Sequence, residues 1–199
     1  MQWNTLLLAQ HANVHAPELA GAEAIFSYQD MVCGGLADEQ LRLRPAEGQN
    51  SLVWLIWHMT RCEDVALNLA VADRAQVLDD EWRSQMRIDR VDIGTGMTPE
   101  EVADLSERVD VTALRNYRLA VGRRTRETLS EIDAMTLDRP VDAQHQWAAQ
   151  ALGEHAGWVG VLWTSWRKRD FLYMASGHCY HHWGEAITVR SLSGFAVGL

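Results

Sequence analysis

Hydrophobic residues along this chain recur at intervals of three and four, and alternation with a period of two is nearly absent. Spacing of three and four gathers apolar side chains on one face of an α-helix, whereas a period of two is typical of β-strands. The pattern therefore predicts an all-α fold. Four long segments carry it, over residues 17–33, 51–71, 98–132 and 165–192. Four long helices with extended connections predict a four-helix bundle with long crossover connections, in one domain spanning residues 1–199.

Local signals predict where these helices begin and end. The first segment opens on a proline and closes before a pair of glycines, which favour a first helical turn and a stop, respectively. Asn50 or Ser51 caps the second segment. Thr98 is followed by a proline and, three residues on, by a glutamate, a typical helix start. The first dozen residues predict a further short helix or a lead into the first long one, and residues 141–163 predict a long connection with a short helix.

Composition and charge narrow the functional classes. The net charge is −9 and Lys and Arg form no long cluster, so nucleic-acid binding, which needs a basic surface, is not expected. No apolar run approaches the roughly 18–20 residues of a membrane span, and the first residues lack the pattern of a secretory signal. Three scattered cysteines argue against a disulfide framework. We therefore expect a cytoplasmic protein that acts on a small molecule.

The most informative stretch lies in the last predicted helix, where His178 and His182 are four residues apart. Side chains at that spacing lie on one face, about 5–6 Å apart at their Cβ atoms. Two such imidazoles can reach one metal ion at the ~2.0–2.1 Å of a zinc–nitrogen bond. His181 has the wrong phase to join them.

A third ligand is predicted on a different helix. His58 lies in the apolar stripe of the second segment, as His178 and His182 lie in the stripe of the last. A polar ring in a core is costly unless its nitrogens are bonded. One shared metal ion satisfies all three rings, and facing helices of a bundle are where such sites are built. Hydrogen-bonded core histidines are the alternative.

Other residues offer rival ligands. His11 and His15 are also four apart, but a proline follows at once. Cys62 is one turn beyond His58, so a His–Cys pair is geometrically feasible, although an ordinary small core residue is the preferred interpretation. His145 and His155 are expected in the connection, as surface or loop residues.

The carboxylates near these histidines are predicted to play lesser parts. Glu185 follows His182 by three residues and either orients an imidazole or caps a helix face. Glu63 and Asp64 are candidates to orient the imidazole of His58 in the same way, but acidic residues beside Arg61 are more typical of a solvated face.

With these residues in view, the chain resembles the DinB-like (YfiT-like) superfamily of metal-binding four-helix bundles. The resemblance rests on the loop and helix cap from Arg44 to Ser51, on the segment Trp54–Asp64 and on the segment His178–Glu185. It implies a divalent metal, zinc or nickel, held by His58, His178 and His182. Some relatives are transferases or isomerases that use low-molecular-weight thiols such as mycothiol or bacillithiol. Relatives are often homodimers, and the family name refers to damage-induced expression, a stress response.

These features lead to a functional hypothesis. Three imidazoles leave an open coordination position, as in catalytic zinc sites. We expect a metal-dependent enzyme in which a small thiol binds as thiolate and attacks an electrophile in a pocket between helices. Hydrolysis through metal-activated water is the close enzymatic alternative. A non-catalytic bundle that binds a metal or haem is the alternative of a different class.

Overall fold

The computed structural model describes residues 3–19, 26–141, 162–163 and 165–197. These residues are mostly helical, and they contain no β-strand. The α-helices are α1 (Thr5–Val14), α2 (Tyr28–Cys33), α3 (Asp38–Leu41), α4 (Leu52–Asp64), α5 (Asp80–Met86), α6 (Pro99–Arg108), α7 (Val111–Glu131), α10 (Lys168–Phe171) and α11 (Gly177–Leu192). Short 3-10 turns lie at Pro17–Leu19, Ala134–Thr136 and Leu172–Ala175, and α4 continues as a π-helix over Val65–Val71.

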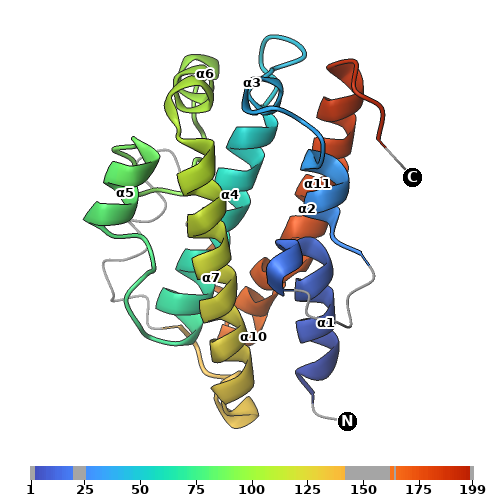
Figure 1. The fold of residues 1–199 in the computed structure, drawn as a ribbon. Coiled ribbons are helices and arrows are strands. Elements are labelled where there is room, and N and C mark those ends of the chain that lie inside the picture. The colour runs from blue at the N-terminus through green and yellow to red at the C-terminus, as the bar shows by residue number, and fades with distance from the viewer. Residues whose placement is uncertain (1–2, 20–25, 142–161, 164, 198–199) are drawn as a thin grey trace.

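The long helices form the predicted all-α bundle. Helices α4, α7 and α11 are its three long members, and α1 with α2 occupies the fourth position (Figure 1). Helix α4 packs most extensively against α7 and then against α11. Among the described helices, none is long and apolar enough to cross a membrane.

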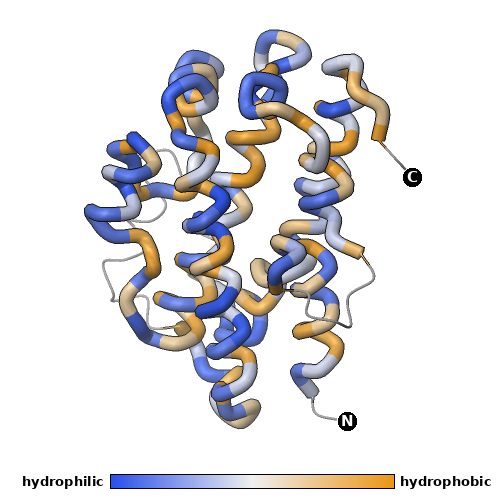
Figure 2. Tube along the Cα trace, in the orientation of Figure 1, coloured by the Kyte–Doolittle hydropathy of each residue, from blue (hydrophilic) through white to orange (hydrophobic). Residues whose placement is uncertain are grey.

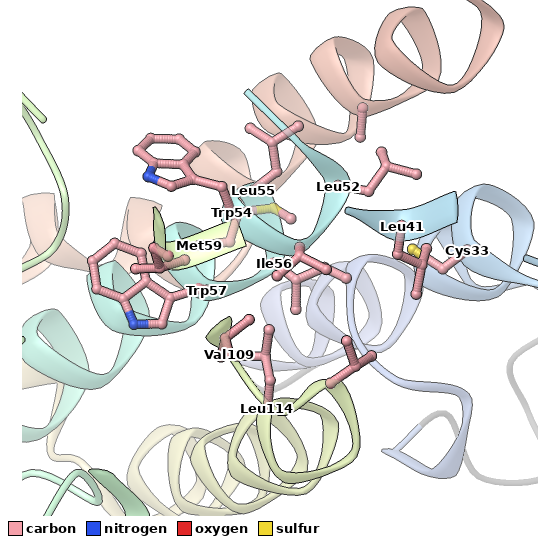
Figure 3. Packing of buried hydrophobic residues seen from close by; sticks show 14 of the residues in the cluster. Cys33, Leu41, Leu52, Trp54, Leu55, Ile56, Trp57, Met59, Val109 and Leu114 are labelled. Carbon is pink, nitrogen blue, oxygen red and sulfur yellow. The ribbon is translucent and has the colours of Figure 1, made fainter. Parts of the chain in front are cut away.

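Helix α4 is the centre of the molecule. All 13 of its residues are buried, and the Ser51 hydroxyl caps it by accepting a hydrogen bond from the Trp54 N–H. Its first six residues, 52–57, are apolar on every side of the helix, which is typical of a buried position. Figure 3 shows its side chains packed against Leu41, Val109 and Leu114 from other parts of the chain. In Figure 2, by contrast, α5 at the outer edge is largely hydrophilic.

Three of the four predicted helices are shorter or more interrupted than the periodicity indicates. The helix predicted over 17–33 begins only at Tyr28, because Ser27 is extended and its hydroxyl accepts the Asp30 N–H as a new cap. The helix predicted over 98–132 divides at Val109, which is extended, and Asp110 caps the second part. The prediction was wrong here because strong internal caps override an unbroken apolar period.

The last predicted helix, 165–192, is also interrupted. Ser176, with φ −147° and ψ −55°, separates a 3-10 turn from α11. The predicted starts at Ser51 and Thr98 and the predicted end at Cys33 are confirmed. The short N-terminal helix is confirmed as α1. Most of the predicted connection over 141–163 lies outside the described residues.

One glycine positions a loop over α4. Gly94 has φ +83°, and a Cβ there would lie 2.4 Å from the ring of Trp57. Only glycine allows both this backbone conformation and this close approach. The loop therefore lies directly on α4 and brings the carbonyl of Ile93 to His58, 2.5 Å from its Nδ1.

Candidate metal centre

The three histidines singled out from the sequence converge in the structure. The ring centroid of His58, on α4, lies 5.2 Å from that of His178 and 4.7 Å from that of His182, both on α11. The centroids of His178 and His182 are 4.5 Å apart. His181 points elsewhere, with its Nδ1 2.5 Å from the hydroxyl of Tyr173. Helical phase thus separated the converging pair from its neighbour correctly.

In two of these rings, those of His58 and His182, the Nδ1 atom already has a hydrogen-bond acceptor. A backbone carbonyl can only accept, so His58 donates its Nδ1–H to Ile93 and its Nε2 carries no proton. His182 Nδ1 donates to Glu185 Oε2 at 2.9 Å. Asn50 holds the other oxygen of Glu185 at 2.8 Å. This is the arrangement in which metal-binding histidines are oriented by a partner behind them.

Glu185 is suited to that supporting position because it is ionised. Burial raises its pKa, but hydrogen bonds from His182 and Asn50 outweigh this, and the pKa is lowered overall. The carboxylate then accepts from His182 and leaves the Nε2 of that ring free as a ligand. The role of orienting an imidazole, one of two predicted for Glu185, agrees with this geometry.

The third ring, His178, has a buried nitrogen without a hydrogen-bond partner. Its Nδ1 is unpaired within the described part of the chain. Burial, followed by the nearby His58 and His182, lowers the pKa of His178 well below its ordinary value. A neutral imidazole is the form that binds a metal. The donor set and the unpaired nitrogen therefore fit a divalent metal ion.

Cys62 adds a fourth candidate donor. Its Sγ lies 3.8 Å from His58 Nε2, and the group whose ligand atoms all lie within 4.8 Å of one another consists of His58, Cys62 and His178, without His182. Burial raises the pKa of Cys62, so without a metal the group is a thiol. The preferred interpretation of Cys62 as a core residue is consistent with its burial, but its sulfur also lines the cavity.

The three rings line a cavity of about 390 Å³. Most of its remaining lining is apolar, from Ile93, Leu162, Trp163, Trp166 and Met174. The polar residues Thr95 and Tyr173 also line it. Small-molecule sites commonly combine apolar walls with a few placed polar groups. The arrangement can therefore hold a small ligand beside the imidazoles.

Comparisons with known proteins agree with this fold. A family model described as the DinB superfamily matches residues 27–186. The chain belongs to the DinB superfamily. The crystal structure of a conserved protein from Enterococcus faecalis is similar, with a TM-score of 0.69 over 97% of this chain and 98% of that one. The two sequences are 19% identical, so this likeness concerns the fold alone. No protein of curated function matches significantly.

The prediction for two acidic residues of this DinB-superfamily chain was wrong. Glu63 and Asp64 were expected on a solvated face beside Arg61, but all three side chains are fully buried. Asp64 pairs with Arg61 at 3.0 Å. Glu63 does not support His58 but faces α1. Five residues along a helix turn it about 140° away from His58, onto a different face of α4.

The structure also places His11 and His15. His11 and His15, the rival pair on α1, do not join the three-histidine cluster but contact Glu63. The four-residue spacing of His11 and His15 was the available signal for this second cluster, and nothing in the sequence pointed to Glu63 as its partner. His145 and His155 lie outside the described residues.

Buried histidines make the metal-free protein sensitive to acid. Burial, and then His182, lowers the pKa of His58 from 6.5 to about 4, against the opposing effect of its bond to Ile93. The unfolded chain then takes up the proton first, so stability falls as the pH drops from about 6.5 toward 4. From His58 alone we expect a loss of about 1 kcal/mol between pH 7.5 and 5.5.

Urea denaturation of the metal-free protein at these two pH values measures this loss. His58→Gln removes the titrating group, so its stability should fall less over the same interval. The same pH dependence in both proteins would contradict the assignment to His58.

Proposed function

We propose that this DinB-superfamily protein is a metal-dependent enzyme that transfers a low-molecular-weight thiol to a small apolar electrophile. A single zinc or nickel ion would be held by His58, His178 and His182. The observation that carries the proposal is the convergence of three imidazoles on one apolar cavity, two of them already held from behind by Ile93 and Glu185.

The ion would supply Lewis acidity, which lowers the pKa of a thiol so that it reacts as thiolate near neutral pH. The protein's own groups then have distinct tasks. Ile93 and the Glu185–Asn50 pair keep the Nε2 atoms of His58 and His182 directed inward. Trp163, Trp166 and the other apolar walls exclude water and favour an apolar electrophile.

Tyr173 supports the same function from the cavity wall. Burial and the nearby Cys179 raise the pKa of its hydroxyl, so it stays protonated near neutral pH. Its side chain lines the cavity, but its hydroxyl lies 2.5 Å from His181 Nδ1, so it would have to leave this contact to donate a hydrogen bond to a bound substrate. Gly177 makes room for it, because a Cβ there would lie 2.4 Å from the Tyr173 ring.

A reduced cytoplasm suits this activity, since it supplies low-molecular-weight thiols and preserves free cysteines. Cys33, Cys62 and Cys179 are all free and buried. An ion is favoured over haem because the three ring centroids lie within 4.5–5.2 Å of one another, which leaves no space for a macrocycle between them.

The test compares metal-free protein with protein reloaded with zinc or nickel. Each is mixed with mycothiol, bacillithiol, glutathione or cysteine and with a chromogenic aromatic halide, and thiol consumption is followed. We expect turnover with at least one thiol that requires the metal and is lost in His58→Ala. Metal-dependent ester cleavage without thiol would support the hydrolase instead. A metal-loaded protein with neither activity would contradict an enzymatic role toward these substrates.

A further inference from the structure

A second cluster of metal-ligating side chains lies between α1 and α4. His11 and His15 come from the end of α1, and Glu63 comes from the end of α4. His11 Nε2 is 2.9 Å from Glu63 Oε1, and His15 Nε2 is 3.6 Å from Glu63 Oε2. All three side chains are 0% exposed. The carboxylate therefore lies in the core between two imidazoles, and only His11 is within hydrogen-bond distance of it.

Several polar atoms of this cluster have no hydrogen-bond partner. His15 Nε2 and Glu63 Oε2 are both buried and unpaired, although they face each other. His11 Nδ1 is also unpaired. Buried polar atoms are almost always satisfied, so each exception needs a physical reason. A cation between the two imidazoles and the carboxylate provides one.

The spacing of the donors fits a single ion. Two ligands bound at about 2.0–2.1 Å to a tetrahedral ion lie about 3.4 Å apart. The separations of 2.9 and 3.6 Å bracket that value, and one ligand atom from each residue lies within 4.8 Å of the others. Two imidazoles and one carboxylate are a familiar donor set for divalent transition metals.

We propose that His11, His15 and Glu63 form a second divalent-metal site, which fastens α1 to α4. It lies on a different face of α4 from His58 and does not depend on the three-histidine site. One nitrogen from each ring and a bidentate carboxylate can fill the coordination positions, and because all three side chains are fully buried, a substrate has no access to the ion. Closed coordination is typical of a structural metal rather than a catalytic one.

The surroundings keep the ligands in place. Gly122 on α7 makes room for His15, because a Cβ there would lie 2.5 Å from its Cε1 and 2.7 Å from its Nε2. Arg118 lies nearby, but its guanidinium donates to Val14, Thr60 and Gln29.

A metal-free arrangement competes with this site. The Ala16 N–H donates to His15 Nδ1 at 2.9 Å, which places the proton of the neutral ring on Nε2, facing Glu63. An ion at Nε2 would move that proton to Nδ1 and displace the Ala16 contact. Without an ion, Glu63 lies buried between the two imidazoles. Its Oε2 is 3.6 Å from His15 Nε2, which is too long for a hydrogen bond.

Counting zinc in matched variants decides between these arrangements. The full chain is stripped with a chelator, reloaded with zinc and desalted, and zinc per chain is measured by mass spectrometry. We expect about two ions in the wild type and in His181→Ala, the control. About one is expected in His58→Ala and in Glu63→Gln, and none in the double variant.

This series can contradict the assignment of either metal site independently of the other. No zinc in His58→Ala, or undiminished zinc in Glu63→Gln, would overturn the second site. One ion in both the wild type and His58→Ala, lost in Glu63→Gln, would instead overturn the three-histidine site and support this one.

A second measurement, amide hydrogen exchange, needs no substitution in the cluster. It therefore tests the site even if Glu63→Gln fails to fold. In the His58→Ala protein, zinc should slow amide hydrogen exchange in α1 at least about tenfold, because an ion ties this helix to α4. The exchange of α6, remote from the cluster, should not change. Equal exchange in α1 with and without zinc would overturn the proposal.

Discussion

Replacing Asp64 with alanine should lower the free energy of unfolding by about 3–5 kcal/mol, the usual cost of breaking a buried ion pair. Its carboxylate is fully buried and accepts from Arg61 at 3.0 Å and from the Tyr117 hydroxyl at 2.6 Å. It also accepts from Asn68 and from the backbone N–H groups of Val77 and Leu78. One side chain therefore joins α4 to α7 and to the loop after the π-helix.

The loss is large because its partners would remain buried. Arg61 keeps a full charge in the core, where an unpaired guanidinium is far more costly than the pair. Burial raises the pKa of Tyr117 well above its ordinary value, so this hydroxyl stays a donor that needs an acceptor. The remaining acceptors of Arg61 are the side chain of Gln76, the Tyr117 hydroxyl and the carbonyls of Val91 and Asp92. None of them carries a charge that neutralises the guanidinium.

Urea denaturation of the metal-free protein measures the effect. Asp89→Ala is the matched control. Asp89 also forms an ion pair, with Arg108 at 3.6 Å, but its side chain is 95% exposed. Exposed pairs contribute about 0–1 kcal/mol, so this variant should be nearly as stable as the wild type. A loss below about 1 kcal/mol for Asp64→Ala would contradict the role of this network.

This network shows where sequence reasoning failed. An amphipathic helix has a solvated side, and Arg61, Glu63 and Asp64 were assigned to one. Helix α4 has none, because other elements cover every face. A signal was present: residues 52–57 are apolar on all sides, which indicates a buried helix whose later charges must be paired. The partner of each charged side chain depends on tertiary packing, which the local sequence pattern does not reveal.

The converging histidines were easier to predict for a physical reason. The i, i+4 spacing of His178 and His182 fixes their shared face through helix geometry alone. His58 needed only the correct stripe on one other helix. The hydrogen bond from His58 to Ile93 could not be foreseen, because it requires the loop that Gly94 folds onto Trp57. The broken first helix likewise depends on Ser27, whose hydroxyl also donates to the His15 carbonyl.

The second large effect concerns metal binding at the three histidines. His58→Ala, His178→Ala and His182→Ala should each remove one zinc ion per chain relative to the wild type. His181→Ala should remove none, because its ring contacts Tyr173 and not the cluster. Comparing each variant with the wild type cancels any ion bound elsewhere, and circular dichroism confirms that each variant is folded.

Glu185→Gln should give an intermediate result. Glutamine has the size of glutamate but no charge, so His182 keeps a hydrogen-bond acceptor and loses the carboxylate behind it. Removing such a supporting partner lowers metal affinity about 10–100-fold, less than the removal of a ligand itself. Competition against a chelating indicator measures this range.

Cys62→Ser should bind zinc with the affinity of the wild type if three imidazoles suffice. A lower zinc affinity would instead make the Cys62 sulfur a ligand. Equal zinc content in His58→Ala and His181→Ala would exclude the three-histidine assignment, and Glu185 would then be only a surface partner of His182.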